Sequence, residues 1–367
     1  MLETTGRDPK ENRKESERKP IETEKGAGSM RTGKASQAVL DRSVLRPLTL
    51  ALAAGEQAAY GEDCALFPEI SGGNQMACAS VCGSLRGPFD RTMDMLVEGI
   101  GNNLAVSGAE LQFVMLNLLY PAAWEESGLK AILQQLGAYC AKRGISVSGG
   151  HTEISRAVNR PAAALTGFGW QKAPEKKEEK KTGEKNAGEK DLVLAGWIGL
   201  AGTAVLAGAQ RERLLERYPR SIVDTALRFG ELTSIREAAR AGNHFGVSAM
   251  HDVSQGGVFG ALWELAERAG AGLEVDLKKI PVRQETIEIC EFFDVNPYQL
   301  YGQGALLLCT DRGEALASRL KDAGIAASVI GHTTEGNDRV IRNGEETRFL
   351  DRPAQDELWR LAEACRD

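Results

Sequence analysis

Apolar and polar positions along the chain fall into two blocks, each with the pattern of alternating strands and helices. In the first block, short apolar runs predict strands at 75–81, 112–119, 145–148 and 162–168. Two segments carry apolar residues at helical spacing, and they predict helices over 93–104 and 129–140. The strand at 145–148 is expected to end at the pair Gly149-Gly150.

The second block opens with a predicted strand at 192–196 and a helix that starts at Ala201. Its clearest helix comes directly after a pair of glycines, and one face of that helix is formed by Val258, Leu262, Leu265 and Ala269. Further strands are predicted at 273–277, 305–310 and near 326–330, with helices at 314–323 and from 354 onward. This mixture predicts an α+β protein of two domains.

Two charged segments set the limits of these blocks. Residues 1–29 are dense in Lys, Arg and Glu and have almost no large apolar side chain, so we expect a disordered tail. The pattern changes at Met30, which makes it a candidate for the true start of the protein. Residues 172–190 are rich in Lys and Glu and predict a solvated linker. The predicted order is a first domain at 30–171, a second at 191–350 and a C-terminal helix at 351–367.

Composition narrows the class of protein. The chain has 367 residues, 42% of them apolar, 6% aromatic and 41 of them glycine, which favours a fold with many tight turns. A formal net charge of -6 argues against a nucleic-acid surface. We expect no membrane span, since no apolar run approaches the roughly 18–20 residues required. The charged start shows no signal peptide, and the seven scattered cysteines predict reduced thiols in the cytoplasm.

The segment from Met250 to Gly257 carries the strongest chemical signal. A polar strand end containing His251 and Asp252 leads into two glycines and then directly into a helix. The first N–H groups of a helix have no partner within it, so this turn suits a phosphate group. Asp252 would hold a metal ion carried by that phosphate. The alternative is an ordinary turn in which Asp252 or Ser254 caps the helix.

Two other turns combine glycine with polar side chains. Glu62 and Asp63 come directly after Gly61 and offer the hard oxygen ligands that Mg²⁺ prefers. The run from Gly149 to Glu153, which includes His151 and Thr152, comes after a predicted strand. Its glycines would let the backbone approach a ligand closely. An acidic surface turn and a capped histidine remain the alternatives.

These motifs resemble the PurM-like, AIR synthase-related family of ATP-dependent enzymes. His251-Asp252-x-x-x-Gly256-Gly257, the helix after it and Ile280-Pro281-Val282 are similar to the family's C-terminal domain. Asn296-Pro297 and the stretch from Gly302 to Leu306 fit the next segment of that domain. Within the family the chain is most similar to the HypE-like branch of hydrogenase maturation factors, although it lacks the terminal catalytic cysteine tail.

The resemblance implies a fold and a setting. It implies an N-terminal domain that forms a dimeric β-barrel with a second copy, and a C-terminal α/β sandwich domain. ATP and Mg²⁺ would lie at the interface of this homodimer, with a small-molecule substrate or a partner protein beside them.

The resemblance also implies roles for particular residues. Catalytic roles fall on Asp63, His151 and Asp252. Cofactor binding falls on Gly149, Gly150, Thr152, Gly256, Gly257 and Lys34. Metal binding falls on Asp63, Glu62, Asn103, Glu153 and Asp252.

Several of these positions depart from the family pattern. Glu62 replaces the first acid of the Gly-Asp-Asp turn, and Asn103 stands where a magnesium-binding Asp is usual. Ser80 lies nearest to an acid that is absent from its strand, and Ala201 replaces another acid. An Asn side chain offers a carbonyl oxygen without charge, so these changes predict weak metal binding.

Three functions are hypotheses at this point. The first is a protein that binds ATP and uses it to activate or phosphorylate a small substrate or a carbonyl-type group. The second is a homodimeric scaffold of the same fold that has lost catalysis. The third is a small-molecule kinase resembling thiamine-monophosphate kinase, suggested by residues 93–99, whose spacing is nevertheless helical. Cys365 falls on the apolar face of the predicted terminal helix and is interpreted as structural.

Overall fold

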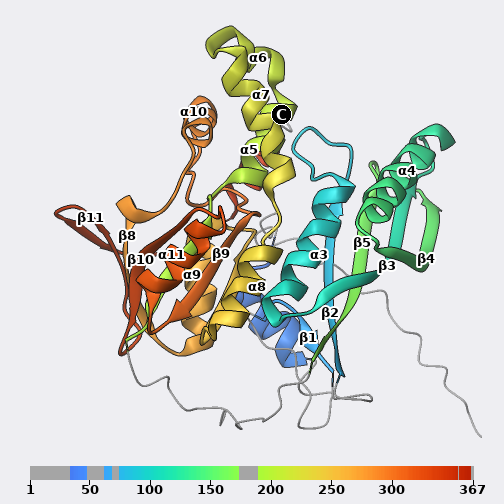
Figure 1. The fold of residues 1–367 in the computed structure, drawn as a ribbon. Coiled ribbons are helices and arrows are strands. Elements are labelled where there is room, and N and C mark those ends of the chain that lie inside the picture. The colour runs from blue at the N-terminus through green and yellow to red at the C-terminus, as the bar shows by residue number, and fades with distance from the viewer. Residues whose placement is uncertain (1–33, 48–61, 68–73, 173–188, 354, 365–367) are drawn as a thin grey trace, which may run out of the picture. The chain divides into compact units, whose positions relative to one another are not determined.

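The computed structural model describes residues 34–47, 62–67, 74–172, 189–353 and 355–364. All of them belong to one compact unit that extends from Thr32 to Asp367. The predicted tail at 1–29, most of the predicted linker and Cys365 lie outside the described residues. Figure 1 shows two groups of strands, each with its own helices.

The first sheet has five strands in the order β1-β2-β5-β3-β4. Their bounds are β1 Ala65–Leu66, β2 Asn74–Ser84, β3 Glu110–Pro121, β4 Ser146–Ser155 and β5 Ala162–Lys172. β3 and β4 run parallel, and the other pairs are antiparallel. Two helices accompany the sheet, α3 (Met93–Ser107) and α4 (Glu126–Lys142). The predicted strands and helices of this block are therefore confirmed.

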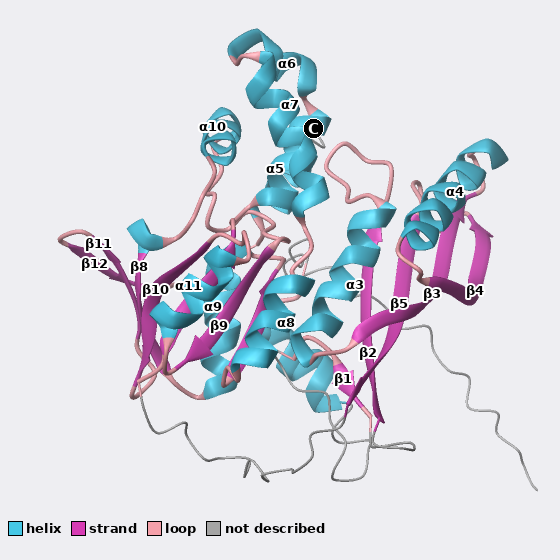
Figure 2. Cartoon of the chain, in the orientation of Figure 1, coloured by secondary structure: helices cyan, strands magenta, loops and turns pink. Residues whose placement is uncertain are grey.

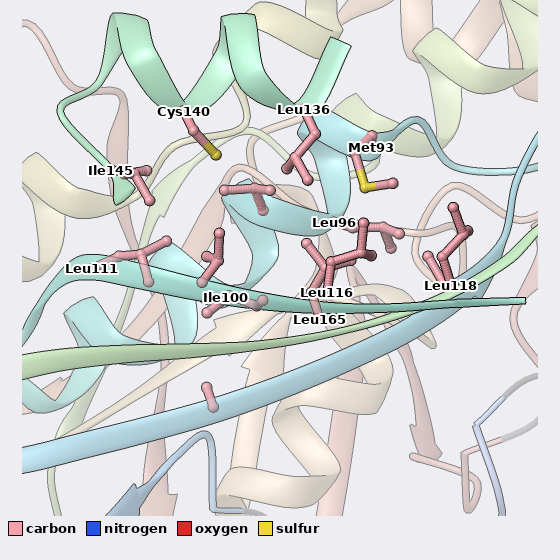
Figure 3. Packing of buried hydrophobic residues seen from close by; sticks show 14 of the residues in the cluster. Met93, Leu96, Ile100, Leu111, Leu116, Leu118, Leu136, Cys140, Ile145 and Leu165 are labelled. Carbon is pink, nitrogen blue, oxygen red and sulfur yellow. The ribbon is translucent and has the colours of Figure 1, made fainter. Parts of the chain in front are cut away.

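One face of the first sheet is packed and the other is bare. On β3, Val114, Leu116 and Leu118 are buried, while the alternate residues Phe113 and Met115 are exposed. The buried face packs on the apolar stripe of α3, with α4 beyond it (Figure 3). The domain therefore has a single core and a second, apolar surface that nothing covers among the described residues.

β4 is longer than the sequence predicts. Gly149-Gly150 does not end the strand, which continues through His151 and Glu153 to Ser155. Gly150 is required because β3 passes very close: a Cβ on Gly150, whose φ is +140°, would lie 1.7 Å from the carbonyl oxygen of Leu116, whereas a Cβ on Gly149 would meet nothing within 4 Å. The sequence shows Gly150 but not the neighbouring strand that requires it.

The second sheet has seven strands in the order β12-β11-β8-β10-β6-β9-β7. Their bounds are β6 Asp191–Gly196, β7 Ala249–Val253, β8 Gly272–Asp276, β9 Ala305–Thr310, β10 Ala327–Thr334, β11 Arg339–Asn343 and β12 Glu346–Phe349. The main helices around it are α5 Leu200–Ala209, α8 Arg236–Phe245, α9 Gly257–Ala269 and α11 Gly313–Asp322. Further helices of the described chain are α1 Gln37–Leu40, α6 Arg211–Arg217, α7 Arg220–Arg228, α10 Gln284–Phe293 and α12 Glu357–Ala364.

Helices cover both faces of this second sheet (Figure 2). Alternate residues of β6 show the layers, because Leu192 and Leu194 pack in a core with α9. Val193 and Ala195 point the other way and pack with residues of α8 and α11. The predicted α/β sandwich domain is thus present, and the fold is two-domain and α+β. No helix in the described part of the chain is long and apolar enough to cross a membrane.

Candidate functional site

The site forms where the end of β7 meets the turn before β1. His251 and Asp252 are buried near the end of β7, which pairs with β9 at the edge of the second sheet. Asp63 comes from the other domain, two residues before β1. His251 Nδ1 lies 2.9 Å from Asp63 Oδ1, so the two domains meet through this pair.

Asp63, His251, Glu264 and Lys34 form a row of side chains in which acids and bases alternate. The other ring nitrogen of His251, Nε2, lies 3.0 Å from Glu264 Oε2, and Glu264 Oε1 accepts from Lys34 Nζ at 2.5 Å. Glu264 and His251 were not predicted as site residues. The sequence does carry a signal for Glu264, because it is an acid on the largely apolar helix α9.

These contacts shift the pKa values of the buried groups. Burial alone would lower the pKa of His251, but the Asp63 charge and hydrogen bonds from Asp63 and Glu264 raise it to about 10. Burial would raise the pKa of Glu264, but its bonds to His251 and the Lys34 charge lower it to about 2. His251 is therefore a cation that holds two carboxylates.

Asp252 behaves differently from its neighbours. Complete burial, and then the negative charge of Asp63, raise the pKa of Asp252 well above its ordinary value. Asn103 lies beside it: with its amide nitrogen turned toward the acceptors, it donates to Asp252 Oδ2 at 3.3 Å and to the Gly99 carbonyl at 3.1 Å. Two crowded carboxylates that resist ionising together are the setting in which a bound cation is most stabilising.

The donor set fits a hard divalent cation. Asp63, His251 and Asp252 each offer an atom, and these atoms lie within 4.8 Å of one another. Since both nitrogens of His251 already face carboxylates, the natural ligands are the carboxylates of Asp63 and Asp252. The Asn103 amide would offer its oxygen only after turning its nitrogen away from Asp252. A small cavity of about 210 Å³ opens beside Asp63, lined also by Ser107, Met250 and Arg268.

Glu62, Ser80 and Lys34 each contact a side chain outside the group formed by Asp63, Asp252 and Asn103. Glu62 Oε1 accepts from Arg268 Nε at 3.1 Å. Ser80, at the position nearest to the absent acid, lies on β2 with its hydroxyl 2.9 Å from that of Thr166 on β5. Lys34 reaches Glu264, so within one chain it supports the acidic cluster.

The residues of β4 are not brought to this cluster by a single chain. Gly149, Gly150, His151, Thr152 and Glu153 all lie on β4, and nine of its ten residues are exposed. β4 forms the opposite edge of the sheet from β1, the strand that begins just after Asp63.

The glycine turn before α9 is occupied by the protein itself. The Gly256 N–H donates to Asp356 Oδ2 at 2.7 Å, and the sequence gives no sign of this contact. A Cβ on Gly257 would lie 2.5 Å from the Tyr298 carbonyl oxygen, so this glycine is required by packing. Phosphate binding at Gly256 and Gly257 stays a prediction.

Two α+β domains that meet at a buried acidic cluster define the PurM-like class of proteins. The chain belongs to the AIR synthase-related family: residues 61–171 match the N-terminal domain of AIR synthase related protein, and residues 188–343 match its C-terminal domain.

The relatives of the chain include HypE proteins. It is 26% identical over 248 residues to the carbamoyl dehydratase HypE of Rhodobacter capsulatus. The aligned segment covers 66% of this chain and 70% of that protein. The chain is 22% identical over 253 residues to the HypE of Rhizobium leguminosarum bv. viciae, covering 68% and 69% respectively.

Solved structures show the same fold. HypE in a HypE–HypF complex has a TM-score of 0.66 at 20% identity, covering 85% of this chain and all of that one. A HypE in complex with ATP has a TM-score of 0.59 at 15% identity, and the match covers 89% of this chain and 97% of that one. AaThiL complexed with AMPPCP and TMP has a TM-score of 0.63 at 16% identity, and the match covers 88% of this chain and 99% of that one.

Proposed function

We propose that the chain is a homodimeric, ATP-binding member of the HypE-like branch, which uses ATP to activate or phosphorylate a small substrate or a carbonyl-type group. The observation that carries the proposal is the buried pair Asp63 and Asp252 with Asn103 beside it. Support comes from neighbours of the same fold, one in complex with ATP and one with AMPPCP.

The proposed homodimer rests on the bare face of the first sheet. Phe113, Met115 and Leu119 on β3 and Trp170 on β5 are exposed large apolar residues of this face. A contiguous apolar surface with an unpaired edge strand is an expected site of association. Pairing two such sheets would give the barrel implied by the family resemblance.

This dimer would also complete the active site. β4 of one copy carries His151, Thr152 and Glu153 and would approach the acidic cluster of the other copy. Gly149 and Gly150 would then let backbone N–H groups approach the phosphates. Each site would thus take its carboxylates from one chain and its glycine strand from the partner.

Within the site, the residues of the chain have separable tasks. Asp63, Asp252 and Asn103 would hold Mg²⁺, which when bound neutralises charge on the transferring phosphoryl group. His251 is a positioning residue, since its two N–H groups fix the carboxylates of Asp63 and Glu264. His151 would act on substrate or phosphate from the partner strand.

Two alternatives are tied to specific observations. A small-molecule kinase is favoured by the structural similarity to thiamine monophosphate kinase. A scaffold without turnover is favoured by Asn103 and Ser80 at positions where the family has acids. A role like that of the carbamoyl dehydratases would further need a mobile terminal cysteine, and Cys365 lies outside the described residues. The cytoplasmic location stays a prediction.

Calorimetric titration with ATP, with and without Mg²⁺, tests the proposal. We expect the wild type to bind ATP with Mg²⁺ and Asp252→Asn to lose at least about tenfold in affinity, since a charge-assisted contact disappears. Asp322→Asn, an exposed position on α11, is the matched control and should bind like the wild type. If the wild type gives no heat with ATP and Mg²⁺, the enzyme proposal fails and the scaffold alternative stands.

A further inference from the structure

A second polar cavity lies between the C-terminal end of α3 and the helix α8. Its volume is about 580 Å³, and residues of α3, β3, β5 and α8 line it. On α8, Arg236, Arg240, Asn243 and His244 recur at the spacing of one helix face. Arg143, just after the end of α4, joins them.

The cationic groups here outnumber the carboxylates that neutralise them. Arg236 and Arg143 share one carboxylate, that of the buried Glu98: Arg236 Nη2 donates to both oxygens at 3.0 Å, and Arg143 Nε lies 3.6 Å away. Arg240 pairs with the exposed Glu110 at 2.8 Å. Three guanidinium groups thus face two carboxylates, and His244 adds charge when protonated.

The shared carboxylate does not face this cavity. Glu98 lines a larger cavity of about 1060 Å³, together with the acids Asp90, Asp94 and Glu231 and the cations Lys142 and Arg143. There the Tyr139 hydroxyl also donates to Glu98, and burial, together with the Glu98 charge, raises the pKa of that hydroxyl. Arg143 therefore lines both cavities, whereas Arg236 and Arg240 line only the one beside α8, where Glu110 is the single acid.

One arginine of this cluster keeps a donor without a partner in the described part of the chain. The Arg236 Nε is buried and has no hydrogen-bond partner among the described residues. Gly101 of α3 gives the guanidinium room, since a Cβ there would lie 3.4 Å from both Arg236 Nε and Nη2. Ser107 and Gln171 add polar groups to the lining. A partly enclosed cluster of arginines with an unused donor is the usual recognition site of phosphate or carboxylate groups.

We propose that this cavity, defined by Arg143, Arg236, Arg240 and His244, binds the phosphate or carboxylate group of a small molecule. Ser107 and Asn243 line both this cavity and the small one beside Asp63. The bound acid is therefore the far end of the substrate whose other end is activated at Asp63 and Asp252. That second assignment rests on the proposed function, whereas anion binding itself does not.

Calorimetry with inorganic phosphate and with succinate, at an ionic strength held constant with sodium chloride, tests the inference. Binding of either anion supports it and tells which acid the cavity prefers. Arg240→Gln should weaken that binding by about tenfold. Arg240 is mostly exposed, so this variant should fold. Arg220→Gln on α7 is the matched control and should bind like the wild type.

The two proposals fail separately. If neither anion binds, or if Arg240→Gln binds as tightly as Arg220→Gln, the anion site is wrong whatever ATP does. If the anion binds and is lost in Arg240→Gln while ATP with Mg²⁺ gives no heat, the anion site stands and the proposed function fails. Competition by ATP that is unaffected by Arg240→Gln would place the anion at the nucleotide site and overturn the inference.

Discussion

Asp356 is the buried carboxylate that accepts the Gly256 N–H at the start of α9, and it also accepts the Leu358 N–H at 2.9 Å. Burial raises its pKa to about 7, although these backbone bonds oppose the shift. One side chain thus caps α12 and ties the C-terminal helix to the glycine turn. Its charge state should affect the stability of the whole protein.

The pH dependence of stability depends on the direction of that shift. The unfolded chain loses the Asp356 proton near the ordinary pKa of 3.8 and the folded chain near 7, so Asp356 lowers stability as pH rises between these values. The loss in the free energy of unfolding over this pH range is up to about 4 kcal/mol. Asp356→Asn should remove this fall, so its free energy of unfolding should rise relative to wild type from pH 4 to 7. Urea titrations measure it, with Asp322→Asn as control, and parallel profiles for wild type and Asp356→Asn would contradict the assignment.

The two adjacent glycines of the turn should respond differently to a methyl group. Gly256→Ala meets only the Gly260 Cα at 3.5 Å, so the cost is that of a positive φ, about 1–2 kcal/mol. Gly257→Ala would place its Cβ 2.5 Å from a carbonyl oxygen and should cost about 3 kcal/mol or more. Urea denaturation compares the two variants. Equal losses in the free energy of unfolding would mean that residues 298–300 move aside to accommodate the added methyl group.

At the scale of single elements, regular periodicity was the reliable signal. The stripe at 93–104 was confirmed as α3 because its residues are spaced for one buried face. Strands β11 and β12 and helices α6, α7, α8 and α10 were not predicted, although α7 carries Val223, Ala226 and Leu227 at helical spacing. The site was predicted in part: Asp63, Asn103 and Asp252 meet, but the contact of Glu264 with His251 and that of Asp356 with the glycine turn were not predicted.

The bare face of the first sheet gives a prediction about association. Met115→Glu places a charge on the exposed face of β3 and should convert the proposed dimer to a monomer, since burying an unpaired carboxylate is costly. The melting temperature should change little, because Met115 is exposed within one chain. Light scattering after gel filtration measures the mass. The matched control, Phe349→Glu on β12 of the other sheet, should stay dimeric, and a wild-type monomer would contradict the account.

For the molecule as a whole, the proposed site takes residues from two domains and from two chains. The carboxylates come from Asp63 and Asp252 at the contact between domains, and the glycine strand would come from a second copy. The family resemblance placed Asp63 and Asp252 in one site, whereas residue spacing alone does not predict the contact between Asp63 and His251, which lie 188 residues apart. The family resemblance supplied the dimer, and the exposed β4 is the observation in this chain that calls for it.

Mixing two inactive variants tests this shared site most directly. Asp252→Asn damages the carboxylate half, and Glu153→Gln with His151→Ala damages the strand half. Each variant alone should bind ATP with Mg²⁺ weakly or not at all. After exchange of subunits, half of the dimers contain one intact site, so about a quarter of all sites should recover binding in calorimetry. Recovery would support a site built from two chains. No recovery, in a mixture shown to contain mixed dimers, would contradict it.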